Sequence, residues 1–557
     1  MAHQIEAVLF DMGGTLRSTK KRSRDERLRF TGEILLLLGS DANPVDFSHL
    51  LARRATAYRR WARETMIELS EADLWTRWML PDWPEAQVRK HAVQLNLLWR
   101  EATGERVVFP ETAEVVLELF RRGYRLGLVS NTTSSTEAPL ALKKLGLTGC
   151  FETMILSAVV GKRKPDPAIL LEATGRMGIR PERCAYVGDL PQRDVAAARQ
   201  AGFSKTVLIH DRSNQRSAPI DDPRLEPDHH IVNLKELLEI FPLRTPPQPA
   251  TIYEASLSTM WAMKNFDWLG DFLEAGRRIG FAHIELNHQI NSAMLEGINL
   301  NGHTVSSVHE PCPADVSVEA LKKRDWLISA TEEASRLEGV KSVQRSIDLA
   351  HRLGARAVVV HPGNVHPDRS LEDQLRQLYE AGQADSEEYG ELKSQLIKRR
   401  EALAPPRLEA VKKSLAELLD YAGRFNILLG LENRYHFLEF PSPDELGELL
   451  SLAGPERLGF IFDVGHAQTL SRLGFFPHEE WLTRFAPRII GTHLHDVIGI
   501  LDHQAPGLGD VDFDLIAAYL PKEAFRTCEF LGSNTPEQVR NGLKVLQEHG
   551  CIQIKAS

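Results

Sequence analysis

The chain has 557 residues and a net charge of -9, with apolar and charged fractions of 43% and 26%. A chain of this length exceeds what one hydrophobic core normally supports, so we expect at least two domains. The acidic balance gives no electrostatic reason to expect nucleic acid as a partner, although a local basic groove stays open.

Five widely spaced cysteines, an odd number with no C-x-x-C pair, indicate a reducing compartment rather than a disulfide framework or a thiolate zinc site. The first residues lack a cationic segment followed by a long apolar core, and no apolar run approaches the roughly 18 residues of a membrane span. We therefore expect a cytoplasmic protein that does not enter a membrane. A homo-oligomer is left open.

Four motifs in the first 241 residues place charged or polar side chains just after apolar segments. Ala7 to Phe10 is a predicted strand that runs into Asp11 and two glycines, which sets a carboxylate beside backbone amides able to face a phosphate. The other three motifs are a strand from Tyr124 to Val129 leading to Ser130 and Asn131, the cation Lys164 before a helix, and a strand from Ala185 to Val187 leading to Asp189 and Asp194.

With these motifs in order, residues 1–241 resemble the haloacid dehalogenase superfamily, and residues 17 to about 105 lie where that family inserts a helical cap. The resemblance implies that Asp11 is the nucleophile and that Ser130, Asn131 and Lys164 hold the phosphoryl group. It also implies a magnesium site formed by Asp11, Asp189 and Asp194. These roles agree with phosphoryl transfer, which mostly needs positioning and charge neutralisation.

One position departs from the phosphatases of that family. They carry a second acid two residues after the nucleophile, and this chain has Gly13 there. Loss of a general acid removes a contribution of roughly 100-fold to 10,000-fold. The first domain is therefore expected to be a slow phosphatase, a member with different chemistry, or a binding domain without turnover.

Residues 242–251, PLRTPPQPAT, are a predicted proline-rich linker, and a second domain is expected over 252–557. Eight short apolar segments there alternate with helical patterns, which predicts a (β/α)8 barrel. These segments are IYEASL, HIEL, TVSSV, AVVV, ILLGL, LGFIF, IIGTHL and RTCEF. The predicted fold class is thus α/β throughout, with a dehalogenase-like domain followed by a TIM barrel.

Acids and histidines follow the predicted barrel strands, at the end where such barrels keep their chemistry. They are Glu285 with His288, His309, His361, Glu432, Asp463 with His466, His493, and Glu529. His503 follows strand seven on a predicted glycine-rich loop, where a lone histidine is more often structural. So many acids and imidazoles are costly to bury unless they share a cation, so we expect a metal site.

The motifs SVHEP, VVHPG, GLEN, FDVGHA, THLHD, DHQAPGLG and CEF resemble the xylose isomerase-like barrel superfamily. In its epimerase branch, the resemblance implies that Glu432, Asp463, His493 and Glu529 hold manganese, magnesium or cobalt. Glu432 and Glu529 would also exchange protons with the substrate. His466, His309 and His361 would then contact that substrate, a sugar or sugar phosphate.

The endonuclease IV branch of the same superfamily implies a different use of these strands. There His309, His361, His466 and His503 would join the other four residues in a trinuclear zinc cluster that activates water. The chain departs from that pattern at Leu501, where an acid is expected two residues before His503. It also lacks an aromatic and basic wedge for opening a duplex, which disfavours DNA repair.

Residues 366–421, between the fourth and fifth strands, form an unusually long segment that we interpret either as a lid or as a structural insert packing on the first domain or a second subunit. For the whole chain we favour a metal-dependent sugar or sugar-phosphate isomerase or epimerase fused to a phosphatase-type domain. The alternatives are a multinuclear metal phosphodiesterase and a metal-binding scaffold with an inactive first domain.

Overall fold

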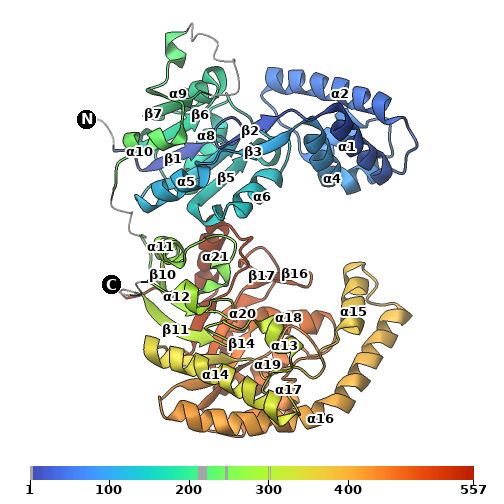
Figure 1. Ribbon diagram of the computed structural model, residues 1–557, viewed down its shortest axis with the longest axis vertical. Helices are drawn as coiled ribbons and strands as arrows, with labels where there is room; N and C mark the ends of the chain where they lie inside the picture. The colour runs from blue at the N-terminus through green and yellow to red at the C-terminus, as the bar shows by residue number, and fades with distance from the viewer. Residues whose placement is uncertain (1–3, 211–221, 245–248, 299, 301–302, 557) are drawn as a thin grey trace. The chain divides into compact units, whose positions relative to one another are not determined.

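The computed structural model describes residues 4–210, 222–244, 249–298, 300 and 303–556. The chain divides into two compact units, 1–247 and 248–557, each built from helices and strands (Figure 1). Residues 245–248 of the predicted linker lie outside the described residues. Within the described part of the chain, no helix is long and apolar enough to cross a membrane.

The first unit is built on a sheet of six parallel strands within its described residues. Their order across the sheet is β5 (Phe151–Leu156), β4 (Arg125–Ser130), β1 (Ala7–Phe10), β6 (Cys184–Gly188), β7 (Lys205–Ile209) and β8 (His229–Ile231). The sequence did not single out β5, β7 or β8. Because β1, β4 and β6 are adjacent and parallel, the motifs at their carboxyl ends meet at one edge of the sheet.

A helical subdomain lies between β2 (Arg17–Lys20) and β3 (Glu105–Val108), which pair antiparallel as its stem. It consists of α1 (Arg24–Leu37), α2 (Pro44–Thr65), α3 (Glu71–Leu74) and α4 (Glu85–Thr103), with Leu51, Tyr58, Trp75 and Leu95 in its own core. The starts of two helices follow from sequence: Ser23 and Glu26 form a capping box on α1, and Asn43 caps α2 before Pro44.

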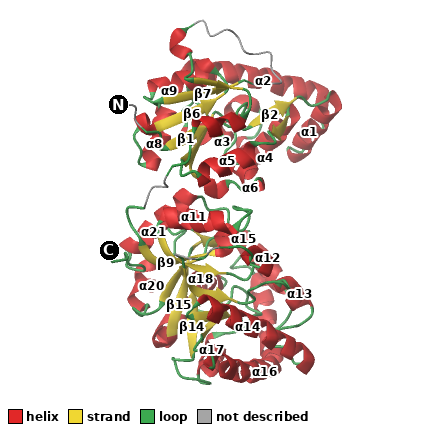
Figure 2. Cartoon of the chain, turned by 60° about the vertical axis from the view of Figure 1, so that its left-hand side comes forward, coloured by secondary structure: helices red, strands yellow, loops and turns green. Residues whose placement is uncertain are grey.

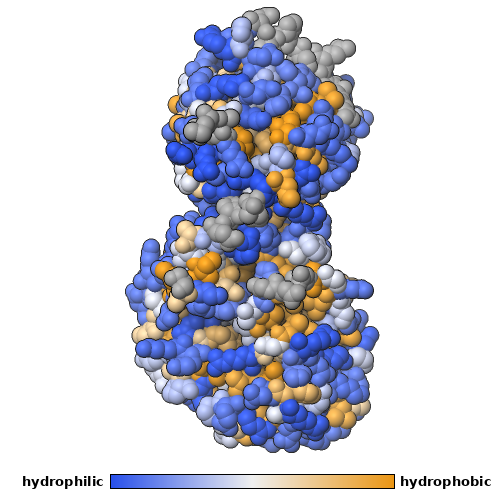
Figure 3. Space-filling view, turned by 90° about the vertical axis from the view of Figure 1, so that its left-hand side faces the viewer, coloured by the Kyte–Doolittle hydropathy of each residue, from blue (hydrophilic) through white to orange (hydrophobic). Residues whose placement is uncertain are grey.

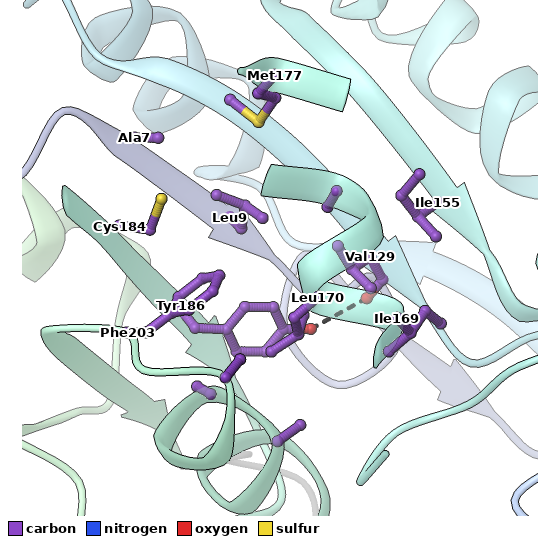
Figure 4. Packing of buried hydrophobic residues seen from close by; sticks show 14 of the residues in the cluster. Ala7, Leu9, Val129, Ile155, Ile169, Leu170, Met177, Cys184, Tyr186 and Phe203 are labelled. Atoms are coloured by element: carbon purple, nitrogen blue, oxygen red, sulfur yellow. Dashed lines mark hydrogen bonds between the residues drawn. The ribbon is translucent and has the colours of Figure 1, made fainter. Parts of the chain in front are cut away.

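Tyr186 is a core residue that lies beneath the motifs at the carboxyl edge of the first sheet. Tyr186 of β6 lies in a core with Leu9, Val129, Leu170 and Phe203, and α8 (Ala168–Met177) covers this face (Figure 4). Its hydroxyl donates to the carbonyl of Val129 at 3.0 Å. The ring therefore fills the core while its oxygen faces the polar edge above.

The second unit is a closed barrel of eight parallel strands over its described residues, with helices around the outside (Figure 2). The strands are β9 (Tyr253–Ser258), β10 (Phe281–Leu286), β11 (Thr304–His309), β12 (Ala357–Val360), β13 (Leu428–Glu432), β14 (Leu458–Asp463), β15 (Ile489–Leu494) and β18 (Phe525–Cys528). They match the eight predicted segments, and the predicted barrel fold is confirmed.

A short hairpin interrupts the pattern after β15. β16 (Asp496–Ile498) and β17 (Leu501–Gln504) pair antiparallel, so His503 lies on a strand and the prediction of a glycine-rich loop at this residue is wrong. The glycines come later, at Gly507 and Gly509, whose amides donate to Asp496 at 2.9 Å each. The Asp496 carboxylate is therefore used to shape this loop.

The long segment between β12 and β13 forms α15 (Ser370–Glu380) and α16 (Glu387–Gly423), and α16 continues through Pro405 and Pro406. The carboxyl-terminal half of α16 packs on the barrel through residues such as Val411 and Leu418. The other half and α15 pack on Phe437, Leu438, Leu470, Leu473 and Ile500, which lie on loops and helices following β13, β14 and β15. This segment is thus a buttress against the barrel mouth.

The surface in Figure 3 is mostly hydrophilic, with hydrophobic residues in scattered patches. All five cysteine side chains are buried.

Candidate functional sites

Three aspartates come together at the edge of the first sheet. Asp11 follows β1, Asp189 follows β6, and Asp194 lies at the start of the next helical segment; their carboxylate oxygens are within 4.8 Å of one another. Two glycines make room for them: a Cβ on Gly14, whose φ is +86°, would come within 2.1 Å of Asp189, and one on Gly188 within 2.4 Å of Asp194. This is the acidic group that the sequence predicted as a magnesium site.

Two cations neutralise this group of aspartates. Nζ of the buried Lys164 lies 2.9 Å from Asp11 and 2.8 Å from Asp194, and it donates to the hydroxyl of Tyr186 at 2.5 Å. Nη2 of Arg193 lies 2.6 Å from both Asp11 and Asp189 and 2.8 Å from Asp194. The sequence analysis missed Arg193 and Tyr186, although Arg193 directly precedes Asp194.

The aspartates differ in their electrostatic surroundings. Burial, together with the charges of Asp11 and Asp194, raises the pKa of Asp189 to about 7, against the opposing charge of Arg193. Burial also works against ionisation of Asp194, but Arg193 and Lys164 hold its pKa below the usual value. Such unequal pKa values in one cluster are typical of sites built to hold a cation or move a proton.

The remaining predicted residues of this site lie beside the aspartates. Ser130 is the last residue of β4 and is buried. The side-chain amide of Asn131 donates to the Lys164 carbonyl at 2.8 Å and accepts from the Lys164 amide at 2.9 Å, so it fixes the backbone that presents Lys164. A contact of Asn131 with substrate stays a prediction. No atom lies within 4 Å of a Cβ built on the exposed Gly13.

In the barrel, a second set of acids and histidines meets at the carboxyl ends of the strands. Glu432 of β13, Asp463 of β14, His493 of β15 and Glu529 after β18 form one fully buried ligand group, with one atom of each within 4.8 Å of the others. Nδ1 of His493 lies 2.7 Å from Glu432 and 3.2 Å from Glu529. Asp463 also caps α18 (Val464–Arg472), where it accepts from the amide of His466 at 2.7 Å.

Two further ligand groups adjoin the first. His309 at the end of β11 and His361 after β12 share Glu432, with Nε2 of His361 2.9 Å from that carboxylate. On the other side, His466 and His503 form a group with Asp502, whose carboxylate lies 3.5 Å from Nε2 of His466 and 3.0 Å from Nδ1 of His503. The acid that the sequence lacks at Leu501 is thus supplied by the next residue, Asp502.

His495 forms a fourth ligand group with Asp463 and His503. Its Nε2 lies 3.1 Å from Asp463, its Nδ1 accepts from the amide of His503 at 2.9 Å, and its ring stacks on that of His503 at 4.2 Å. His288, after β10, lies with its ring centroid 5.1 Å from that of His309. His288 is one of the predicted acids and histidines at the strand ends, and His495 belongs to the THLHD motif.

An arginine that the sequence analysis also missed lies in this mouth. Arg434, two residues after Glu432, pairs with that carboxylate and lies 2.5 Å from Nε2 of His361. Its loop is held by the buttress: the buried carboxylate of Glu372 on α15 accepts from His436 at 2.9 Å and from the amide of Phe437 at 3.2 Å.

The charges of the barrel site favour cation binding. Burial opposes ionisation of Glu432, yet Arg434 and hydrogen bonds from His309, His361 and His493 hold its pKa well below the usual value. His493 and His503 likewise lower the pKa of Glu529 well below the usual value against the effect of burial. The carboxylates are therefore ionised at neutral pH, and buried anions of this number need a shared cation.

The donor set fits divalent metal ions. Three groups with two imidazoles and one carboxylate each suit zinc, and the group with three carboxylates and one imidazole suits manganese, magnesium or cobalt. At the first site, three carboxylates suit magnesium.

Comparison with known proteins agrees with this division. Residues 5–202 match the family model of haloacid dehalogenase-like hydrolases, and residues 396–549 match that of the xylose isomerase-like TIM barrel. The chain therefore joins a haloacid dehalogenase-like domain to a xylose isomerase-like TIM barrel.

Curated relatives match the first domain. A glyceraldehyde 3-phosphate phosphatase of Methanopyrus kandleri is 32% identical over 132 residues, which are 24% of this chain and 55% of the relative. A phosphoglycolate phosphatase of Nitrosococcus oceani is 29% identical over 239 residues, 42% of this chain and 96% of the relative. This chain spans only about half the length of several curated relatives that it matches.

Solved structures resemble each domain. A D-tagatose 3-epimerase-like protein has 20% identity and a TM-score of 0.38, covering 53% of this chain and 96% of its own. A 2-haloacid dehalogenase from Pseudomonas syringae pv. Tomato has 24% identity and a TM-score of 0.33, covering 42% of this chain and 98% of its own.

Proposed function

We propose that the barrel hydrolyses a phosphodiester at a multinuclear metal centre. The observation that carries this proposal is that the His309, His361 and Glu432 group and the His466, Asp502 and His503 group both adjoin the four-residue group. A site for one ion would use only the four-residue group. Bound ions of this kind lower the pKa of a coordinated water and polarise a phosphoryl oxygen.

The residues of the chain have distinct parts in this proposal. Burial and the neighbouring charge of Arg434 lower the pKa of His361 well below its usual value, so its imidazole is neutral and able to act as a ligand. Arg434 also supplies a fixed positive charge in the mouth, suited to a phosphate oxygen. Hydrolysis joins a water oxygen to phosphorus, breaks the bond to the leaving oxygen, and returns a proton to that oxygen.

For the first domain we propose slow, magnesium-dependent hydrolysis of phosphomonoesters. Asp11 would attack phosphorus and displace the alcohol oxygen, which takes up a proton, and water would then hydrolyse the aspartyl phosphate to release inorganic phosphate. Lys164 would neutralise the charge of the phosphoryl oxygens, and Gly13 accounts for the slow rate. The names of the curated relatives, which are phosphatases of small phosphomonoesters, support this substrate class. A diester cleaved by the barrel gives a monoester, so the two domains would act in succession.

A second candidate for the barrel is the predicted sugar isomerase or epimerase. Its support is that Glu432, at the end of β13, and Glu529, directly after β18, both approach Nδ1 of His493, as a carboxylate pair around one ion would. In that mechanism one carboxylate removes a proton beside a carbonyl and the other returns it. The cytoplasmic location and a small-molecule substrate rather than nucleic acid stay predictions.

The test uses the full chain, bis(4-nitrophenyl) phosphate, and a panel of ketoses and their phosphates. Wild type is expected to release nitrophenol and then inorganic phosphate, Asp11→Asn to stop at 4-nitrophenyl phosphate, and His361→Ala to release nothing from the diester. Two or three metal ions per barrel are expected. One ion per barrel with interconversion of a ketose and no diester cleavage would replace the proposal by the isomerase, and metal binding without any turnover would favour a scaffold.

A further inference from the structure

Glu285 is a fully buried carboxylate that belongs to none of the four ligand groups found among the described residues of the barrel. It lies on β10, in register with Ser307 of β11 and Ser258 of β9. It is one of the predicted acids at the strand ends, but neither reaction proposed for the barrel uses it. A buried charge is costly unless neighbouring groups compensate it, so Glu285 is expected to have a partner in the barrel.

Side chains from three other strands of the barrel, β11, β15 and β18, donate hydrogen bonds to this carboxylate. Oε2 of Glu285 accepts from the hydroxyl of Ser307 at 2.6 Å, from that of Thr527 at 3.3 Å, and from Nε2 of His493 at 3.3 Å. Oε1 lies 3.2 Å from the same nitrogen of His493 and has no hydrogen bond of its own among the described residues. Of these three contacts, His493 is the one that connects Glu285 to a ligand group.

The imidazole of His493 is therefore held from two sides. Nδ1 faces the ligand group, 2.7 Å from Glu432, while Nε2 faces Glu285. A ring with a hydrogen on Nε2 satisfies Glu285 and leaves the lone pair of Nδ1 for a cation. The opposite tautomer would set two unprotonated acceptors against each other inside the barrel, which is costly where no water can intervene.

We propose that Glu285 is a positioning residue that fixes His493 with Nδ1 toward Glu432, Asp463 and Glu529 and strengthens it as a metal ligand. A carboxylate hydrogen-bonded to the far nitrogen of an imidazole ligand orients the ring and raises its basicity. The inference rests on the proposed metal centre, but it does not depend on which reaction that centre performs.

The test compares metal affinity in Glu285→Gln and Ser307→Ala, using chelator competition with Co²⁺ on the full chain. Glu285→Gln keeps the shape and one acceptor oxygen but removes the charge. The affinity of this variant for its weakest-bound Co²⁺ ion is expected to fall by about 10-fold to 100-fold, and the cobalt d–d absorption bands are expected to change. Ser307→Ala removes the 2.6 Å hydrogen bond to the same carboxylate but leaves the charge facing His493, so its affinity and spectrum should stay close to wild type.

Without metal, the Glu285→Gln variant is expected to have the same melting temperature as the wild type, because the charge that it removes is buried and costly. Wild-type affinity and an unchanged cobalt spectrum in Glu285→Gln would overturn the inference. A parallel loss of metal and folding in both variants would also overturn it, because that result indicates a structural role. Metal binding that responds to Glu285→Gln without any diester cleavage would leave the inference standing and remove the proposed reaction. A wild-type barrel that binds no metal would remove both.

Discussion

Oε1 of Glu432 lies 2.7 Å from Nδ1 of His493, and neither side chain has any exposed surface. The same carboxylate faces His361 through its other oxygen, so Glu432 belongs to two of the four ligand groups. A bridging carboxylate is costly to bury alone and effective between two cations. Glu432 is therefore the residue whose loss should affect more than one ion.

The first prediction concerns this bridge. Glu432→Gln should lose at least one metal ion per barrel and weaken a second by about 10-fold or more, because the amide offers one neutral oxygen in place of a shared charge. Metal content after dialysis, measured by atomic emission, checks this. Glu409→Gln, on the exposed face of α16, is the matched control. Full retention of metal with loss of ketose turnover would instead support the isomerase.

The second prediction concerns Gly13. Because no atom lies within 4 Å of a Cβ at this position, Gly13→Asp should fold and place an acid close to the Asp11 carboxylate. We expect hydrolysis of 4-nitrophenyl phosphate to rise by about 100-fold or more, since general acid catalysis contributes that much. The control is Gly13→Asn, which has a similar shape without the acid. Fast wild-type hydrolysis that Asp11→Asn abolishes would show that another residue already supplies the proton.

The third prediction concerns the guanidinium of Arg193, which contacts all three aspartates. Arg193→Met should lower the melting temperature of the first domain in the absence of metal, because the aspartates then repel one another with only Lys164 to balance them. Added Mg²⁺ should bind the folded state and so recover much of the lost melting temperature. Thermal unfolding with and without Mg²⁺ measures this. A variant that neither loses stability nor gains a Mg²⁺ response would show that Arg193 is dispensable.

The fourth prediction concerns Glu372, which holds the loop of Arg434. Burial raises its pKa, but hydrogen bonding and charge from His436 and the charge of Arg376 outweigh it, so the pKa in the folded protein lies below the usual value. A lowered pKa means that the charge stabilises the fold above the unfolded pKa of about 4.3 and that this stability is lost as the pH falls further.

Glu372→Gln should therefore cost roughly 2–4 kcal/mol near pH 7, with a smaller difference from wild type below about pH 4. Urea unfolding of the two proteins across that pH range measures the difference. Glu391→Gln, at an exposed position of α16, is the control. A difference that grows on acidification would have the wrong sign for a lowered pKa.

The sequence was sufficient for the fold because strand and helix patterns are local. The eight barrel segments and the strands before Asp11, Ser130 and Asp189 are short apolar runs bounded by polar residues, a pattern that a single chain displays directly. The short edge strand β8, in which His229 is half-buried and His230 is exposed, has no such pattern and was not predicted from the sequence.

Contacts within the sites were harder to predict because they depend on side-chain directions across strands. Arg193 and Arg434 stand beside predicted acids in the sequence, yet only the structure shows that they turn into the carboxylate groups. Asp502 was missed because its position was inferred from a spacing of two residues before His503. In the β16–β17 hairpin, whose register shifts, the residue next to the expected position reaches the same ligand group.

Two adjacent prolines inside α16 have a consequence for how this helix covers the barrel. Pro405 and Pro406 lack the amides that would extend the helical ladder backward, a deficit of about 3 kcal/mol within a helix that is absent when proline stands in the first turn. A chain that entered this helix at Pro405 would possess a standard helix start and a complete barrel wall. The part of α16 that covers the barrel therefore does not depend on the residues before Pro405 for a helix start, and those residues are left to hold the loops at the barrel mouth.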